Sequence, residues 1–100
     1  MQVLLYHHDV FERHDTGPWH PERPDRLAAA VEGVEASGLE VIRREPGPAG
    51  LDVIGAIHDE AYIKRIESFC RGGGGALDAD TVVSEDSWEA ALRSAGAGLD

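Results

Sequence analysis

The sequence has almost no cysteine, the residue that crosslinks protein chains. Its 100 residues contain one cysteine, Cys70, and one methionine. A single cysteine excludes both an intramolecular disulfide and a cage of thiolate ligands around a metal. Because disulfides form and persist in oxidising compartments, a chain without crosslinks fits a reducing cytoplasm, which is the expected location.

Positive charge and long apolar runs are also scarce. Nine lysines and arginines against 19 aspartates and glutamates give a formal net charge of −10 at pH 7. This charge repels phosphate backbones and anionic lipids, so neither nucleic-acid nor membrane partners are expected. The first apolar run, residues 3–6, is too short for a signal peptide or a membrane span. Hydrophobic residues still make up 42% of the chain, an ordinary share for a protein that folds.

The first half of the chain is predicted to form a strand, a helix and a second strand. Residues 3–6 are apolar without a break, which is typical of a strand buried on both faces. Pro24 suits a first helical turn, and apolar positions at helical spacing lead from it to Gly38, which is placed to end the helix. Residues 39–43 are predicted to form the second strand. A strand, a helix and a strand with short joints make a βαβ unit, so the expected class is α/β with parallel strands.

The second half is predicted to be mostly helical. Residues 51–57 fit a short helix better than a strand, and Asp59 is a candidate N-cap for a helix that ends near Arg71, before four glycines. A turn or short extended piece is expected over residues 76–83, followed by a last helix. Its candidate caps are Ser84, Asp86 and Ser87, and its apolar face is expected to carry Trp88, Ala91, Leu92 and Ala95.

This set of elements is incomplete as a sheet protein. Two parallel strands with apolar faces need neighbouring strands beside them and helices on both faces. The predicted elements provide only the edge of such a layer. The chain is therefore expected to be the beginning of a larger open parallel sheet.

Histidines are crowded near the N-terminus, and they raise the possibility of a metal site. The four are His7, His8, His14 and His20. Zinc takes three or four nitrogen, oxygen or sulfur ligands, but side chains alternate along an extended chain, so His7 and His8 cannot both face one ion unless the backbone turns between them. Their spacing also lacks a paired helical zinc motif. Local hydrogen bonding is the favoured interpretation, and a histidine-rich metal-binding protein is the weaker alternative.

Three other features have both an ordinary and a functional interpretation. Arg26, in the first turn of the predicted helix, is either an exposed surface arginine or a cation held by partners or an anion. Asp78 and Asp80 could act as paired carboxylates, but they lie in a polar turn where carboxylates are common. Cys70 fits the apolar stripe of a helix better than the role of a nucleophile.

Three separated stretches of the chain are HPERPDRL at 20–27, IHDEAYI at 57–63 and LDADTVVSEDSWEAALRSAGA at 77–97. In this order and spacing they resemble the opening portion of the histone deacetylase family, which includes bacterial acetoin-utilisation proteins and acetylpolyamine amidohydrolases. The chain is most similar to the class II-like bacterial members. The resemblance implies a single α/β domain with a mostly parallel, arginase-like sheet, of which residues 1–100 are the N-terminal part.

The resemblance also implies a chemistry, namely zinc-dependent hydrolysis of the acetyl-amide bonds of acetyl-lysine or acetylpolyamine substrates. In the family, the zinc ligands, a tandem histidine pair and a tyrosine that carry this reaction come later in the chain than the matched portion. His7 and His8 are not that tandem, because they end the first strand. We therefore expect no catalytic residue and no metal ligand among the 100 residues, and we expect the chain to be inactive by itself.

Two site residues are carried over from the family. Arg26 matches an arginine that lines an internal channel behind the zinc, where a permanent cation stabilises departing acetate. Asp80 matches a position at the rim of the substrate tunnel whose carboxylate accepts hydrogen bonds from backbone amides of a peptide substrate. Four further motif residues are assigned structural roles, namely His20, Pro21, His58 and Tyr62.

A rival hypothesis treats the chain as a self-standing acidic interaction module without catalytic chemistry. Part of a larger sheet should aggregate or pack loosely by itself, whereas a module should be monodisperse and should unfold cooperatively. The sequence makes no prediction of the oligomeric state.

Overall fold

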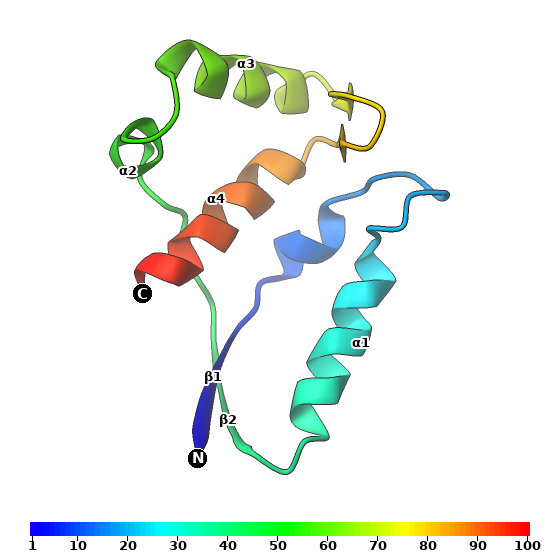
Figure 1. Cartoon of the computed structure of the whole chain (residues 1–100), viewed down its shortest axis with the longest axis vertical. Helices are drawn as coiled ribbons and strands as arrows, with labels where there is room; N and C mark the ends of the chain where they lie inside the picture. The colour runs from blue at the N-terminus through cyan, green and yellow to red at the C-terminus, as the bar shows by residue number, and fades with distance from the viewer.

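A pair of parallel strands joined by a helix forms one end of the molecule (Figure 1). The structure is a computed structural model that describes all 100 residues. Strand β1 (Gln2–Tyr6) pairs with β2 (Glu40–Arg44) in parallel, with Gln2 opposite Glu40 and Tyr6 opposite Arg44. Helix α1 (Pro24–Glu35) lies between them in sequence. The predicted βαβ unit is confirmed, with the strand boundaries shifted by a residue.

Helix α1 begins at Pro24, as its sequence predicts, and ends at Glu35, three residues before Gly38. Pro24 occupies the first turn, where its fixed φ suits a helix and its missing N–H costs no hydrogen bond. Gly38 has a φ of +81°, which lets the chain reverse toward β2 without the strain that a side chain would add. Leu27, Val31 and Val34 are half-buried, but no residue of α1 is fully buried. The helix therefore has only part of the packing that its apolar face can make.

The strand β1 is less covered than its composition predicts. A strand with both faces buried is expected at residues 3–6, yet Leu4 is 52% exposed. The face that carries Leu4 is therefore about half open, and β1 has only one neighbouring strand, β2.

A short 3-10 helix, η1 (Asp9–Arg13), follows β1 and is not predicted from the sequence. The Val10 N–H donates to Nδ1 of His8 at 3.0 Å, so His8 caps this turn. Val10 is completely buried, and η1 contacts both α1 and α4. One turn carries too few apolar residues to show helical periodicity, which explains why it escapes detection.

The second half is helical, as predicted, apart from one small hairpin (Figure 1). Its elements are α2 (Leu51–Gly55), α3 (Glu60–Arg71), β3 (Gly75–Ala76), β4 (Val82–Val83) and α4 (Ser87–Leu99). Asp59 stands at the N-cap position of α3, although its side chain makes no capping hydrogen bond. Gly74 is needed in the glycine run, since it has a φ of +77° and a Cβ there would overlap the backbone of Val83. None of the helices has the length and apolar character needed to cross a lipid bilayer.

The buried face of α4 differs from the predicted one. Trp88 and Leu92 are half-buried, but Ala91 and Ala95 are exposed. The buried residues are Ser87, Ala90 and Gly96. The small residues face inward because α4 packs closely on the loop at residues 46–49. Three contacts define this packing: Ala49 N–H donates to the Leu92 carbonyl at 2.9 Å, Arg93 Nη1 donates to the Pro46 carbonyl at 2.8 Å, and a Cβ on Gly96 would overlap the Gly47 carbonyl.

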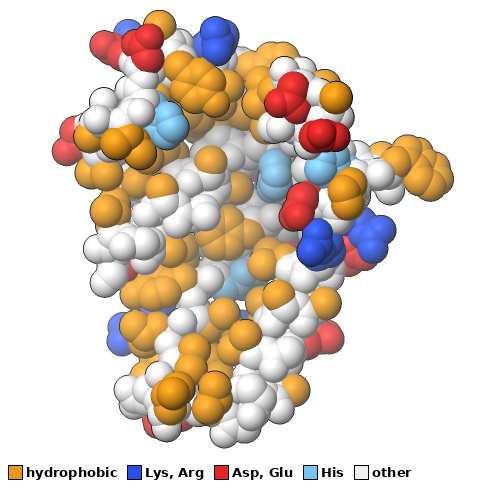
Figure 2. Space-filling view, viewed as in Figure 1, with side chains coloured by type: hydrophobic (Ala, Val, Ile, Leu, Met, Phe, Trp, Pro, Cys, Tyr) orange, Lys and Arg blue, Asp and Glu red, His pale blue; other side chains and the backbone are white.

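The chain exposes more surface than a compact protein of its mass. Its solvent-accessible area is 6743 Å², whereas a compact protein of 10.8 kDa exposes about 5,500 Å². The radius of gyration is 14.9 Å against about 13 Å for a compact domain of this length, and the molecule is flat, at 44 × 34 × 18 Å. Apolar side chains are spread over much of the face in Figure 2. These proportions are those of an incomplete sheet domain.

The close approach of α4 to the loop at residues 46–49 predicts opposite effects for two glycines of the same helix. Gly96→Ala should lower the free energy of unfolding by about 1–3 kcal/mol, because the added methyl group overlaps the Gly47 carbonyl. Gly98→Ala meets no atom within 4 Å and should be neutral or stabilising by up to ~1 kcal/mol. Helical circular dichroism at one dilute concentration compares both variants with the parent chain, and an equal helical signal in the two variants would contradict this packing.

Candidate functional site

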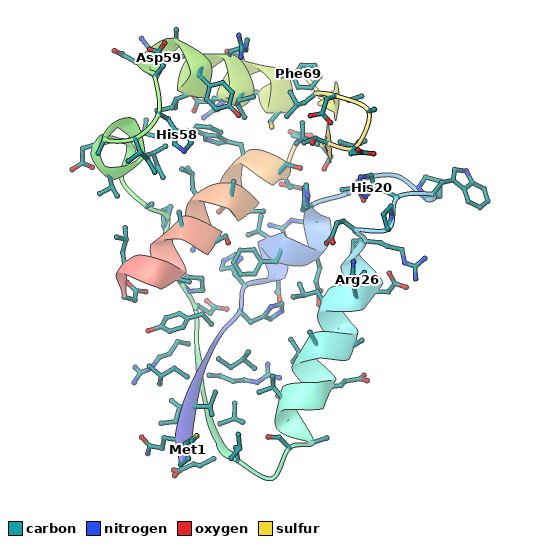
Figure 3. All side chains as sticks on the ribbon, viewed as in Figure 1. Met1, His20, Arg26, His58, Asp59 and Phe69 are labelled. Atoms are coloured by element: carbon teal, nitrogen blue, oxygen red, sulfur yellow. The ribbon has the colours of Figure 1, made fainter.

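Two segments of the chain meet beside a pocket of about 500 Å³. We call residues 16–23, which precede α1, the proline loop, and residues 77–81, between β3 and β4, the acidic turn. His20 of the proline loop lies against the acidic turn, and its Nε2 is 2.7 Å from the carbonyl oxygen of Asp80, sixty positions away (Figure 3). Trp19 and Pro21 line the same pocket, and Trp19 is 93% exposed. The first and third of the sequence motifs are therefore in direct contact.

The proline loop is closed by its own hydrogen bonds. The Thr16 hydroxyl is buried and donates to the Glu22 carbonyl, which ties the start of the loop to its end. The Asp15 carboxylate accepts from the Gly17 N–H at 2.8 Å, where Gly17 has a φ of +90°. The Glu22 N–H donates to Nδ1 of His20 at 3.0 Å. With its prolines, this loop is a stiff support for the residues that it carries.

The acidic turn is organised around Asp78 rather than around a pair of carboxylates. The Asp80 N–H donates to Asp78 Oδ1 at 2.9 Å, and the Leu77 N–H donates to the Thr81 carbonyl at 2.8 Å. Hydrogen bonds to its carboxylate lower the pKa of Asp78, with the Asp80 N–H as the main cause and the Thr81 hydroxyl as the next. The two exposed carboxylates therefore differ in their contacts: Asp78 accepts hydrogen bonds within the turn, and no hydrogen bond of the Asp80 carboxylate is found.

Arg26 lines a second, larger pocket of about 670 Å³. Its apolar walls include Phe11, Leu27, Ile66 and Trp88. Arg26 Nη1 donates to Glu22 Oε1 at 2.8 Å and to the Pro21 carbonyl at 3.3 Å, and its side chain is 57% exposed (Figure 3). Arg26 thus combines the local ion pair of an ordinary surface arginine with a place on the wall of a mostly apolar pocket.

A second link between distant segments is not predicted from the sequence. His14 Nδ1 is 2.5 Å from Ser87 Oγ, and Ser87 is buried at the start of α4. Ser84 N–H donates to the same Ser87 oxygen at 2.8 Å, while Ser84 Oγ accepts from the Asp15 N–H at 3.0 Å. This network holds the start of the proline loop against α4. Ser84 and Ser87 are apparent in the sequence only as candidate helix caps, which does not reveal a partner 73 positions away.

The described side chains do not assemble a metal site. No group of three or more histidine, cysteine, aspartate or glutamate side chains lies close enough to hold an ion. Each of the four N-terminal histidines has a different neighbour: Glu12 for His7, the Val10 N–H for His8, Ser87 for His14 and the Asp80 carbonyl for His20. These residues do not fit a zinc-ligand set, so we derive no step of chemistry through a metal from them.

Three other residues noted in the sequence, Cys70, His58 and Tyr62, make packing contacts. Cys70 is 1% exposed, and burial raises the pKa of its thiol, so it is a protonated core residue as expected. The rings of His58 and Tyr62 stack at 5.9 Å on the surface, and the Arg65 guanidinium lies 5.4 Å from the centre of the Tyr62 ring. These contacts are the kind of packing expected of structural motif residues.

Comparison with known proteins gives consistent matches. Residues 20–100 match the family described as histone deacetylase domain. An uncharacterized protein of Synechocystis sp. is 36% identical over 103 residues, a match that covers 98% of this chain and 34% of that protein. A protein of Methanothermobacter thermautotrophicus named "Probable deacetylase" is 32% identical over 97 residues, covering 97% of this chain and 29% of that protein.

A solved structure shows the same fold. The crystal structure of the HDA15 HD domain superimposes with a TM-score of 0.80 at 21% sequence identity, covering 94% of this chain and 29% of that one. The predicted arginase/deacetylase-like α/β fold, incomplete in this chain, is thereby confirmed. The chain spans about a third of the length of the relatives that it matches.

The lowered pKa of Asp78 predicts how the acidic turn responds to acid. Because the pKa is lower in the folded turn than the ordinary value of about 3.9, the ionised carboxylate stabilises the turn above that value, and this stabilisation is lost as pH falls through the lowered pKa. The NMR shift of the Asp80 amide proton should follow this titration, and Asp78→Asn should abolish it. An Asp80 amide that titrates at the ordinary pKa or above it would contradict the assignment.

Proposed function

Because the chain belongs to the histone deacetylase family, we propose that it forms one wall of a deacetylase active site within a single, larger domain. One observation supports this most directly: two family motifs sixty positions apart, HPERPDRL and LDADTVV, are hydrogen-bonded to each other beside a pocket. Both motifs lie within residues 20–100, the part of the chain that matches the family. The reaction proposed for the complete domain is hydrolysis of an acetyl-amide bond.

We propose that this reaction depends on zinc and acts on acetyl-lysine or acetylpolyamine substrates. The described residues offer no ligand cluster, so the zinc ligands and the catalytic histidine pair would come from polypeptide beyond this third of the domain. The zinc would polarise the acetyl carbonyl and activate a water. The 100 residues would supply pocket walls and charge, and they would be inactive by themselves.

Arg26 is proposed to attract the acetate product. Its guanidinium lines a pocket of about 670 Å³ whose walls are mostly apolar, where a permanent cation acts on an anion more strongly than in open water. Its ion pair with Glu22 is exposed, and such pairs contribute little, so the guanidinium can turn from Glu22 to an anionic product at small cost.

Asp80 is proposed to bind the substrate backbone at the rim. It lines the pocket of about 500 Å³, it is exposed, and no hydrogen bond or ion pair within the chain engages its carboxylate. An ionised carboxylate accepts hydrogen bonds from peptide N–H groups, and these charge-assisted bonds are stronger than neutral ones.

The rival hypothesis of a self-standing acidic module is less well supported. A module of this mass would bury enough surface to reach the area of a compact protein, whereas this chain exposes 6743 Å² instead of about 5,500 Å². The exposed apolar residues include Leu4, Leu51, Ile57 and Leu99.

The proposal predicts a contrast between the chain and a chimera that contains it. In the chimera, residues 1–100 replace the segment that they match in the Methanothermobacter relative. With an acetyl-lysine peptide and added zinc, the chimera should release acetate and a chelator should stop it, while the 100 residues alone should show no turnover. Chelator-sensitive turnover by the 100 residues, or a folded chimera without activity beside an active parent, would contradict the proposal.

Two substitutions in the chimera separate the proposed roles. Asp80→Asn should raise KM for a peptide about 10- to 100-fold, since a hydrogen bond to a charged group contributes about 1.5–3 kcal/mol. Arg26→Gln should instead lower kcat, by about tenfold for each 1.4 kcal/mol of lost stabilisation. Arg43→Gln is the matched control, because Arg43 pairs with Glu35 and lines neither pocket. An effect of Arg43→Gln equal to that of Arg26→Gln would refute a specific role for Arg26.

A further inference from the structure

Both peptide groups that flank Asp80 are held by side chains. The N–H of Asp80 donates to Asp78 Oδ1 at 2.9 Å, and the carbonyl of Asp80 is 2.7 Å from Nε2 of His20. Because these groups belong to the peptide planes before and after Asp80, the two contacts restrict both of its backbone dihedrals. They therefore fix the direction in which the Asp80 side chain leaves the backbone.

The hydrogen bonds of His20 also determine which ring nitrogen carries the proton. The Glu22 N–H can only donate, so Nδ1 of His20, at 3.0 Å from it, is the acceptor. In a neutral imidazole the other nitrogen then bears the proton, and Nε2–H donates to the Asp80 carbonyl. The ring is thus held at both nitrogens, one by its own loop and one by the acidic turn.

The proline loop that carries His20 is held by its own contacts, whereas the Asp80 carboxylate has no partner. The buried Thr16 hydroxyl closes the proline loop by bonding to the Glu22 carbonyl, and Pro21 directly follows His20. The Asp80 carboxylate has no partner within the chain and lines the pocket of about 500 Å³. His20 is therefore the connection through which a stiff loop positions an exposed carboxylate.

We propose that His20 is a positioning residue for Asp80, holding the rim carboxylate in the orientation that binds a substrate backbone. This inference rests on the proposed function of Asp80 and goes beyond the interpretation from sequence, in which His20 only shapes its own loop. The acidic turn has a second anchor in Asp78, so loss of His20 should misdirect the carboxylate without removing the turn.

Three substitutions in the chimera distinguish positioning from loop shaping. The amide nitrogen of Gln can reach the place of Nε2, whereas Asn can accept near Nδ1 but cannot reach the Asp80 carbonyl. If His20 positions Asp80, His20→Ala and His20→Asn should raise KM for a peptide about tenfold, the effect of one lost hydrogen bond to a positioned group, and His20→Gln should restore most of the affinity. If His20 only shapes its loop, His20→Asn should be the variant that rescues, which would overturn the proposal.

Two controls keep the effect specific to the rim carboxylate. KM for a small acetyl-lysine substrate without peptide bonds should change little in His20→Ala, because that substrate has no backbone for Asp80 to bind. In an Asp80→Asn background, His20→Ala should add no further rise in KM, as expected for residues that act as one unit. An equal rise for both substrates, or additive effects, would show a general structural defect and overturn the proposal.

A spectroscopic measurement tests the contact independently of activity. In the chimera labelled with ¹⁵N-histidine, with the His20 signal assigned by its absence in His20→Ala, long-range ¹H–¹⁵N correlation should show His20 with the proton on Nε2 and an accepting Nδ1. A proton on Nδ1, or an average of both tautomers, would overturn the proposal. A chimera without activity but with the expected tautomer would count against the proposed function while leaving the His20–Asp80 contact intact.

Discussion

The proline loop and the acidic turn meet at one hydrogen bond, between the His20 side chain and the backbone carbonyl of Asp80. The candidate rim site depends on this contact, because the two segments are sixty positions apart and no strand pairing joins them. The His14–Ser87 contact strengthens the same arrangement, since it holds the start of the proline loop against α4. The contacts of His14 and His20 therefore fix the proline loop against the rest of the chain, although few side chains of the chain are fully buried.

The elements of the fold were largely predictable, since their signals are local. Pro24 begins α1, Gly38 follows its end by three residues, and the short apolar runs on either side predict β1 and β2 to within a residue. The buried face of α4 was not predictable, because it depends on the close approach of Gly96 to Gly47, which no periodicity within the helix reveals. Burial of β1 on both faces was predicted from its composition, but the neighbours that would cover Leu4 are not among these 100 residues.

The candidate site was predictable only in part, and mainly through resemblance. Composition and spacing do not separate Arg26 and Asp80 from ordinary surface residues, and only the family motifs indicate a functional role for them. The structure then explains why Asp78 and Asp80 differ, since one carboxylate bonds to the turn and the other is free. The partners of His14 and His20 could not be predicted, because hydrogen bonds between residues 73 and 60 positions apart leave no pattern in a single sequence.

The central proposal is that this chain is one part of a larger sheet domain, in which other polypeptide covers its apolar faces. Sedimentation velocity of the purified 100 residues, over a range of concentrations and with a hydrophobic dye bound in parallel, tests this claim most directly. The account predicts self-association that increases with concentration, together with strong dye binding, because side chains such as Leu4 and Ile57 are exposed. A monodisperse monomer that binds no dye and unfolds in one sharp transition would contradict it.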